Sequence, residues 1–439
     1  KSLLLAAGLC VGANAAWAND AYFGSSAKVC DPWDASSKSN TYALPKGGSI
    51  TVNFTNYTNV DTDTYPTEAT EGKTKWELFW NWILVMQYNN SDFLAYRSDL
   101  YGWQSAWNSE NQTCIENYWT HFTRSSMDGA SVVLKIDRDA SNNFTIKATM
   151  SKDNDSWWEQ LVFTYDTAGD NDVYFYLTGE NCYGVISSVI GDKFVGTTEN
   201  VVPWWNCFSE YYSIEPGKTL TLNFKNYTDG TQNWDNWILG LTNDYNRNSG
   251  NNYKEYLILR SDNNAWGTTY ETNKSSLTNS YDWDNFKSDM NGADVELKIR
   301  RLGTKVAIKA TTTTTSGNVY YEQFIISDCG TGTDTETFRA FLLVENGHLT
   351  DITSSVADTP AGAAEYLYTI KAVDGSDNDL QTFATGAYWT DESAISVTYP
   401  QCILSGTTLY KIANNNSGNW FSTEITPNEA IVNDIIIFF

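Results

Sequence analysis

A set of polar and aromatic side chains occurs twice in this sequence, and its residue types suit the binding of a sugar ring. Its polar members are Asn81, Arg97 and Asp99 in one copy and Asn236, Arg260 and Asp262 in the other. Its aromatic members are Phe79, Trp103 and Trp119 in the first copy and Trp234, Trp266 and Trp283 in the second. Sugar hydroxyls exchange hydrogen bonds with amide, guanidinium and carboxylate groups, and the apolar C–H face of the ring packs on an aromatic side chain. The pattern predicts one glycan-binding site in each copy.

A structural ion pair is the alternative interpretation of the same residues. Arg97 and Asp99 are two positions apart, as are Arg260 and Asp262, so the members of each pair lie on the same face of a strand. A repeated fold repeats its structural ion pairs as readily as its binding sites. Both interpretations therefore stay open at the level of the sequence.

Catalytic motifs are scarce in the chain. A retaining glycoside hydrolase needs two neighbouring carboxylates, whereas Glu159 and Glu322 are single strand carboxylates at matching positions of the two copies. The sequence contains no G-x-S-x-G, P-loop or H-E-x-x-H motif, and it has only two histidines, His121 and His348. We predict that the protein is not an enzyme, with a glycoside hydrolase as the third-ranked alternative.

No cofactor is predicted, although a structural calcium ion remains open at the acidic turns. Such turns include Asp153/Asp155, Asp282/Asp284 and residues 374–379. They lack the ligand pattern of an EF-hand, and ordinary solvated turns explain them as well. The six cysteines that follow the N-terminal segment are Cys30, Cys114, Cys182, Cys207, Cys329 and Cys402. Their spacing does not choose among the possible disulfide pairings.

The two polar sets belong to two copies of one longer repeat. Residues 48–58 recur at 217–228, residues 81–84 recur at 236–239, and residues 127–136 recur at 290–299. The offset between copies changes from block to block, which places the insertions in loops. We predict a first β-sandwich at 19–195, a second at 196–358, and a small β-rich module at 359–439 that is truncated at its apolar end.

Hydrophobic residues within each copy alternate with a period of two. Ile50, Val52 and Phe54 alternate with polar residues, which predicts half-buried strands. The residues that we assign to the core face of the next shared strand are Trp82, Leu84 and Met86, matched by Trp237, Leu239 and Leu241. We expect an all-β chain of two tandem jelly-roll sandwiches plus the small C-terminal module, with the Asn/Arg/Asp set on the opposite sheet face.

Three shared segments resemble a known class of module. They are Asn-Trp-Ile-Leu, Arg-Ser-Asp-x-x-x-Trp and Trp-Asp-Asn-Phe-Lys-Ser-Asp-Met-Asn-Gly-Ala. They look like the repeated jelly-roll modules of secreted multimodular proteins from gut and rumen Bacteroidetes. The resemblance covers both repeats and implies carbohydrate-binding modules with a glucanase-lectin-like sandwich. It transfers no site residue to this chain, so the predicted sites depend on strand phase alone.

Charge and the N-terminal segment restrict the partners and the location. The chain has 28 Lys and Arg against 53 Asp and Glu, a formal charge of −25, which disfavours binding to nucleic acid. Residues 1–18 have the layout of a secretory signal ending in Ala16-Trp17-Ala18, and this stretch is too short for a transmembrane segment. We therefore predict a secreted or cell-surface, non-catalytic protein that binds a polysaccharide or other glycan, with further modules of a longer chain as candidate partners. A structural spacer or adhesin is the alternative.

Overall fold

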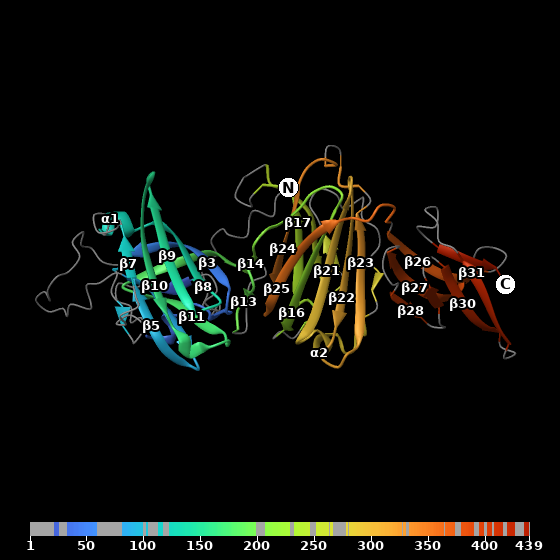
Figure 1. Cartoon of the computed structure of the whole chain (residues 1–439), viewed down its shortest axis with the longest axis horizontal. Helices are drawn as coiled ribbons and strands as arrows, with labels where there is room; N and C mark the ends of the chain where they lie inside the picture. The colour runs from blue at the N-terminus through green and yellow to red at the C-terminus, as the bar shows by residue number, and fades with distance from the viewer. Residues whose placement is uncertain are drawn as a thin grey trace, which may run out of the picture.

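The structure is a computed structural model and is almost entirely β (Figure 1). It describes residues 22–25, 33–58, 81–99, 102–103, 113–116, 123–198, 207–228, 232–245, 252–262, 264–266, 278–279, 281–326, 328–330, 333–363, 365–373, 379–389, 395–398, 402–405, 408–415, 419–425 and 434–438. The predicted signal segment lies outside these residues. The strands form two β-sandwiches and a smaller β unit, which follow one another along the long axis of Figure 1. This architecture confirms the predicted all-β, jelly-roll-like fold.

The first repeat is a sandwich of a front and a back sheet. In spatial order, the front sheet contains β1 (Tyr22–Gly24), β12 (Cys182–Gly191), β3 (Ser49–Thr58), β8 (Ala130–Arg138), β9 (Asn143–Lys152), β10 (Asp155–Thr164) and β7 (Thr113–Glu116). The back sheet contains β2 (Tyr42–Leu44), β11 (Val173–Glu180), β4 (Asn81–Tyr88), β5 (Ser91–Arg97) and β6 (Gly102–Trp103). Short helical turns occur at η1 (Ala35–Ser37), α1 (Arg124–Met127) and η4 (Asp166–Ala168).

The second repeat has the same strand order. Its front sheet contains β13 (Val195–Gly196), β25 (Gly347–Asp358), β16 (Lys218–Thr228), β21 (Ala293–Leu302), β22 (Lys305–Thr313), β23 (Val319–Ile326) and β20 (Thr278–Asn279). Its back strands are β14 (Cys207–Ser209) and β15 (Tyr212–Ile214), then β24 (Phe338–Val344), β17 (Trp237–Thr242), β18 (Glu255–Arg260) and β19 (Asn264–Trp266), with the helix α2 (Phe286–Met290). A register shift beside Asn53 recurs beside Asn223, so even the irregularity of this strand pair is repeated.

Hydrogen bonds join the two repeats into one continuous sheet. Strand β12 of the first repeat pairs in parallel with β14, where Val189 lies opposite Cys207. Strand β14 in turn pairs with β24, where Phe208 lies opposite Leu343. The front sheet of the first repeat therefore continues into the back sheet of the second.

The C-terminal unit is built from seven described strands. Its larger sheet contains β28 (Ile395–Thr398), β27 (Asp379–Trp389), β26 (Glu365–Val373) and β32 (Asp434–Phe438). Its smaller sheet contains β29 (Cys402–Ser405), β30 (Thr408–Asn415) and β31 (Asn419–Ile425). The acidic turn at 374–379 that left a calcium ion open lies largely outside the described residues.

The core confirms the predicted strand phase. Ile50, Val52 and Phe54 point between the sheets and are buried. Trp82 and Trp237 are fully buried, and each ring meets a phenylalanine of the front sheet edge to face at 6.0 Å between centroids. The predicted core residues of β4 and β17 are therefore in the core. The residues that alternate with them, such as Ile83, are buried as well, so these two strands are covered on both faces rather than half-buried.

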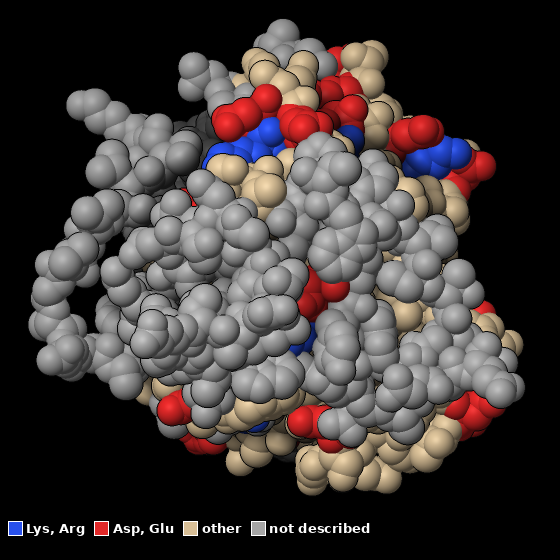
Figure 2. All heavy atoms as spheres, turned by 90° about the vertical axis from the view of Figure 1, so that its left-hand side faces the viewer, with Lys and Arg blue, Asp and Glu red and all other residues tan. Residues whose placement is uncertain are grey.

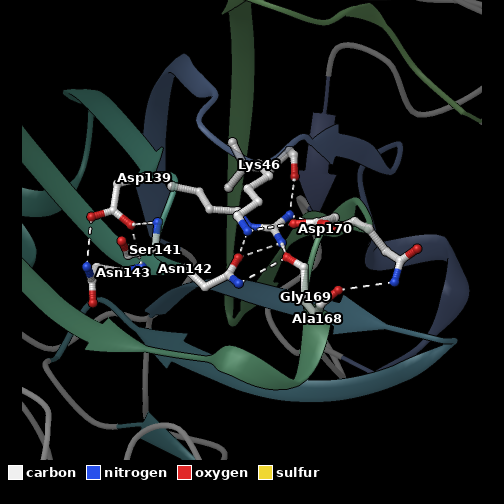
Figure 3. Close-up of polar contacts among 11 residues, drawn as sticks. Lys46, Asp139, Ser141, Asn142, Asn143, Ala168, Gly169 and Asp170 are labelled. Carbon is white, nitrogen blue, oxygen red and sulfur yellow. Dashed lines mark hydrogen bonds and ion pairs between the residues drawn. The ribbon is translucent and has the colours of Figure 1, made fainter.

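A buried arginine closes the same end of each sandwich. Arg138 donates hydrogen bonds to the carbonyl oxygens of Leu44, Gly169 and Asn171 at 2.7 to 3.1 Å. Figure 3 shows the surrounding bonds, in which Asn142 donates to Gly169 and Lys46 pairs with Asp170. In the second repeat, the equivalent arginine is Arg301, which donates to the carbonyls of Ile214, Thr333 and Glu336. Both arginines tie the front sheet to the start of the back sheet.

One of the six cysteines considered for disulfides is reduced. Cys329 is a buried free thiol, so it takes no part in a disulfide, and burial raises its pKa to about 12.

Among the helices that the structure describes, none is long and apolar enough to cross a bilayer.

Candidate functional site

Both predicted Arg–Asp sets are two-pronged ion pairs at the same end of their sandwiches. In the first repeat, Arg97 donates from Nε and Nη2 to the two carboxylate oxygens of Asp99, at 3.1 and 2.6 Å. In the second repeat, Arg260 makes the same two bonds to Asp262, at 3.0 and 2.7 Å. This end lies opposite the end that Arg138 and Arg301 close. The structure therefore shows the ion pair of the alternative interpretation in both copies.

Each ion pair has a second carboxylate that the sequence analysis missed. Glu180 lies 3.5 Å from the Arg97 guanidinium, and Glu345 lies 3.9 Å from that of Arg260. Both glutamates precede an asparagine with positive φ, at Asn181 and Asn346. The sequence does contain a signal for these glutamates, because a Glu-Asn dipeptide occurs at the end of the matching strand in both copies.

The two ion pairs differ in their access to solvent. The solvent-exposed fractions of Arg97 and Asp99 are 1% and 8%. Their side chains are on the outer face of the back sheet, which is covered, because Ile83, Val85 and Tyr176 of that face are buried too. Arg97 and Asp99, which we predicted to contact a glycan, are therefore interior residues of the first repeat in this structure.

Arg260 keeps a partly open position beside an exposed tryptophan. Its side chain is 18% exposed, and those of Asp262 and Glu345 are 10% and 22% exposed. The Trp234 ring lies 5.9 Å from the Arg260 guanidinium and is 42% exposed. The guanidinium therefore packs on one face of the indole ring, and the remainder of the ring is open to solvent.

Buried polar contacts fix the loop that carries Trp234. The carboxylate of Asp235 accepts from Asn346 Nδ2 at 2.6 Å and from the backbone N–H of Gln232 at 2.7 Å. Asn236 is 1% exposed and accepts from Asn226 Nδ2 at 2.6 Å. Asn236, which was predicted to contact a ligand, is buried in this structure and helps to position the loop.

A second exposed tryptophan lies at the same end of the second sandwich. Trp283 is 41% exposed and packs against Tyr281 and Phe286 at 5.7 and 5.0 Å between ring centroids. Asn226 connects this loop to the Trp234 loop, because its amide also donates to the carbonyl of Met290 at 2.9 Å. Two of the three predicted rim tryptophans of the second repeat, Trp234 and Trp283, therefore lie close in sequence to segments that Asn226 bonds, at Asn236 and at Met290.

The remaining predicted site residues are placed only in part. Asn81 begins β4, Trp103 lies in β6 opposite Ala95, and Trp266 lies in β19 opposite Ile258. Phe79 and Trp119 lie outside the described residues. Among the described side chains, the exposed and partly exposed members of the predicted sites therefore belong to the second repeat.

The site is acidic overall. Arg260 is its only described cation, against the carboxylates of Asp262 and Glu345. Burial raises the pKa of Glu345, and the neighbouring Arg260 opposes this shift. Figure 2 shows Asp and Glu side chains spread over the described surface at the end that carries the first repeat, with Lys and Arg beside some of them. No group of three His, Cys, Asp or Glu side chains with metal-binding geometry occurs within the described ranges.

The matching strand glutamates are core residues. Glu159 and Glu322 are 0% and 1% exposed, on the inward faces of β10 and β23. Tyr281 donates its hydroxyl to Glu322 Oε2 at 3.1 Å. Burial raises the pKa of Glu322 to about 8, so this carboxyl is protonated at neutral pH.

Comparisons with known proteins find similarity among solved structures. No protein-family model and no curated protein matches the sequence. Among solved structures, the chain is similar to the mouse laminin alpha1 chain, domains LG4-5, with 10% sequence identity and a TM-score of 0.18. The alignment covers 80% of this chain and 94% of the laminin chain.

Proposed function

We propose that the chain is an extracellular, non-catalytic glycan-binding protein whose site is the loop end of the second repeat. The proposed contacts are the rings of Trp234 and Trp283 and the polar groups of Arg260, Asp262 and Glu345. The observation that carries the proposal is the Trp234–Arg260 pair, in which a cation supports an indole that is 42% exposed. A large aromatic surface left open beside partly exposed polar groups suits a ring with one apolar face and several hydroxyls.

The charge of the site favours a neutral glycan over an acidic one. Two carboxylates surround one guanidinium at 2.7 and 3.9 Å. Both accept hydrogen bonds from sugar hydroxyls, whereas a uronate or sulfate group would meet like charge. The formal charge of −25 on the whole chain adds to this repulsion at low salt.

The absence of catalysis is part of the proposal. A glycoside hydrolase needs two carboxyl groups that reach the scissile bond from solvent. Glu159 and Glu322 are buried between the sheets. Asp262 is engaged by both guanidinium bonds of Arg260. These positions support binding without hydrolysis.

Replacing Trp234 with alanine is expected to weaken glycan binding by about 2- to 13-fold. The estimate takes about 0.5 to 1.5 kcal/mol for ring packing on an aromatic and about 1.4 kcal/mol per decade of affinity. Isothermal titration of the full chain with neutral glucan, xylan and mannan oligosaccharides measures the change, and a polygalacturonate serves as the acidic comparison.

Trp33→Ala is the matched control for this experiment. Trp33 is 46% exposed but lies in the first repeat, far in sequence from the proposed contacts. Its loss is expected to leave the affinity unchanged. Equal affinities for the wild type and Trp234→Ala would contradict the proposed site, as would preferential binding of the polyuronate.

A structural spacer is the second candidate function. It is favoured by the continuous sheet through β12, β14 and β24, which restrains bending between the repeats. The calorimetric titration described above distinguishes the two functions, because a spacer binds none of the neutral glycans at millimolar concentration.

A further inference from the structure

A tryptophan of the C-terminal unit is buried against the second repeat. Trp389 is the last residue of β27 and is 0% exposed. It forms an apolar cluster with Ala307 of β22 and Ile325 of β23. Both of these residues belong to the outer face of the front sheet, because they alternate with the inward-facing Val306, Ile308 and Ile326.

Two cations of the same sheet face surround the indole. The Arg300 guanidinium lies 4.2 Å from the ring centroid of Trp389, and Lys309 Nζ lies 5.7 Å from it. Arg300 and Lys309 are 2% and 4% exposed. A cation–π contact gains strength when both partners are removed from water. Arg300 is also oriented by donating from Nε to Thr219 Oγ1 at 3.3 Å.

The first repeat lacks this arrangement at the equivalent position. Strand pairing aligns Arg300 opposite Ala307 and Asp137 opposite Thr145, so Asp137 takes the place of Arg300. Asp137 pairs with Lys135 at 2.9 Å, and these side chains are 37% and 53% exposed. The same sheet face is thus solvated in the first repeat and occupied in the second.

We propose that the outer face around Arg300, Ala307, Lys309 and Ile325 is a specific docking site for Trp389. Docking couples the C-terminal unit to the second repeat as one body. It also covers the part of this sheet face around Ala307 and Ile325. The inference concerns a different surface from the proposed glycan site and does not depend on it.

The Arg300→Asp variant tests the docking directly. It gives the second repeat the residue that the first repeat has, replaces attraction for the indole with an acidic group, and leaves the C-terminal unit unaltered. The expected loss is roughly 30-fold in the ratio of docked to undocked molecules, which corresponds to about 2 kcal/mol at 1.4 kcal/mol per decade. Spin labels on one exposed residue of the second repeat and one of the C-terminal unit report the docking in the full chain. The wild type is expected to give one narrow distance distribution and Arg300→Asp a broad one.

Two further variants make the outcome decisive. Lys298→Ala removes a cation from the same strand, one that pairs with Glu296 at 3.2 Å, and it is expected to keep the narrow distribution. Trp389→Ala is expected to broaden it as Arg300→Asp does. Circular dichroism and melting of each variant establish that the second repeat remains folded. A narrow distribution for a folded Arg300→Asp chain overturns the proposal, as does equal broadening by Lys298→Ala. Arg300→Asp is expected to leave glycan affinity unchanged, so failure of the docking proposal and failure of the glycan proposal give different results.

Discussion

Trp237→Ala is expected to lower the free energy of unfolding of the second repeat by about 3 to 5 kcal/mol. Trp237 is fully buried and packs edge to face on Phe224 at 6.0 Å. Its removal leaves a cavity between two sheets whose strands are held by hydrogen bonds and cannot close over it. Calorimetry of the full chain measures the effect as a downward shift of one transition by about 6 to 20 °C.

Trp234→Ala is the matched comparison for this experiment. The ring of Trp234 is 42% exposed, so its loss is expected to change stability by less than about 1 kcal/mol. The two tryptophans are three positions apart on the same segment, yet one is predicted to affect folding and the other binding. A loss of stability from Trp234→Ala as large as that from Trp237→Ala would show that the exposed ring is structural and would favour the spacer.

Glu322→Gln is expected to remove a pH dependence of stability between about pH 4.5 and pH 8. The pKa of Glu322 rises from 4.5 to about 8 on folding, mainly because burial disfavours the charged form. The folded chain therefore binds this proton more tightly than the unfolded chain. The stabilisation is complete below pH 4.5 and is lost as the pH rises towards 8, by up to about 1.4 kcal/mol per pH unit.

Glutamine resembles the protonated carboxyl in shape and keeps an oxygen that accepts from the Tyr281 hydroxyl. The variant is therefore expected to gain stability relative to the wild type as the pH rises, by a few kcal/mol over the window. Urea unfolding of both chains at pH 5 and pH 8.5 measures this difference. Glu296→Gln is the control, because that side chain lies on the outer face of the same sheet and is 44% exposed. A constant difference between Glu322→Gln and the wild type at both pH values would contradict the raised pKa.

Local alternation was sufficient to predict the strands and the core rows. Ile50, Val52 and Phe54 point inward as the period of two indicates, and Trp82 and Trp237 occupy matching core positions. The same alternation misjudged the opposite face of β4 and β17. Strand phase assigns residues to one side of a sheet, but it does not reveal whether another part of the chain covers that side.

For the candidate site too, the sequence predicted which residues share a face but not which of them are buried. The sequence placed Arg260 and Asp262 on one face and Trp234 and Trp283 near it, and the structure places Arg260 beside the Trp234 ring. The sequence did not separate the buried Arg97 pair from the partly open Arg260 pair, since the two have the same residues at the same spacing. It also missed Glu345, which lies 85 positions after Arg260 and approaches it only because β24 pairs with β17.

The sequence by itself determined that the chain is all-β, that it contains two copies of one sandwich, and which alternating apolar side chains form the shared core rows. These properties depend on the alternation of neighbouring residues and on repeated segments, both of which are local. Only the tertiary structure decided which ion pair is buried, that Glu322 lies between the sheets as a neutral acid, and that Trp389 rests on Arg300. Burial and charge pairing depend on segments that are distant in the chain, so they exist only once the sheets have packed.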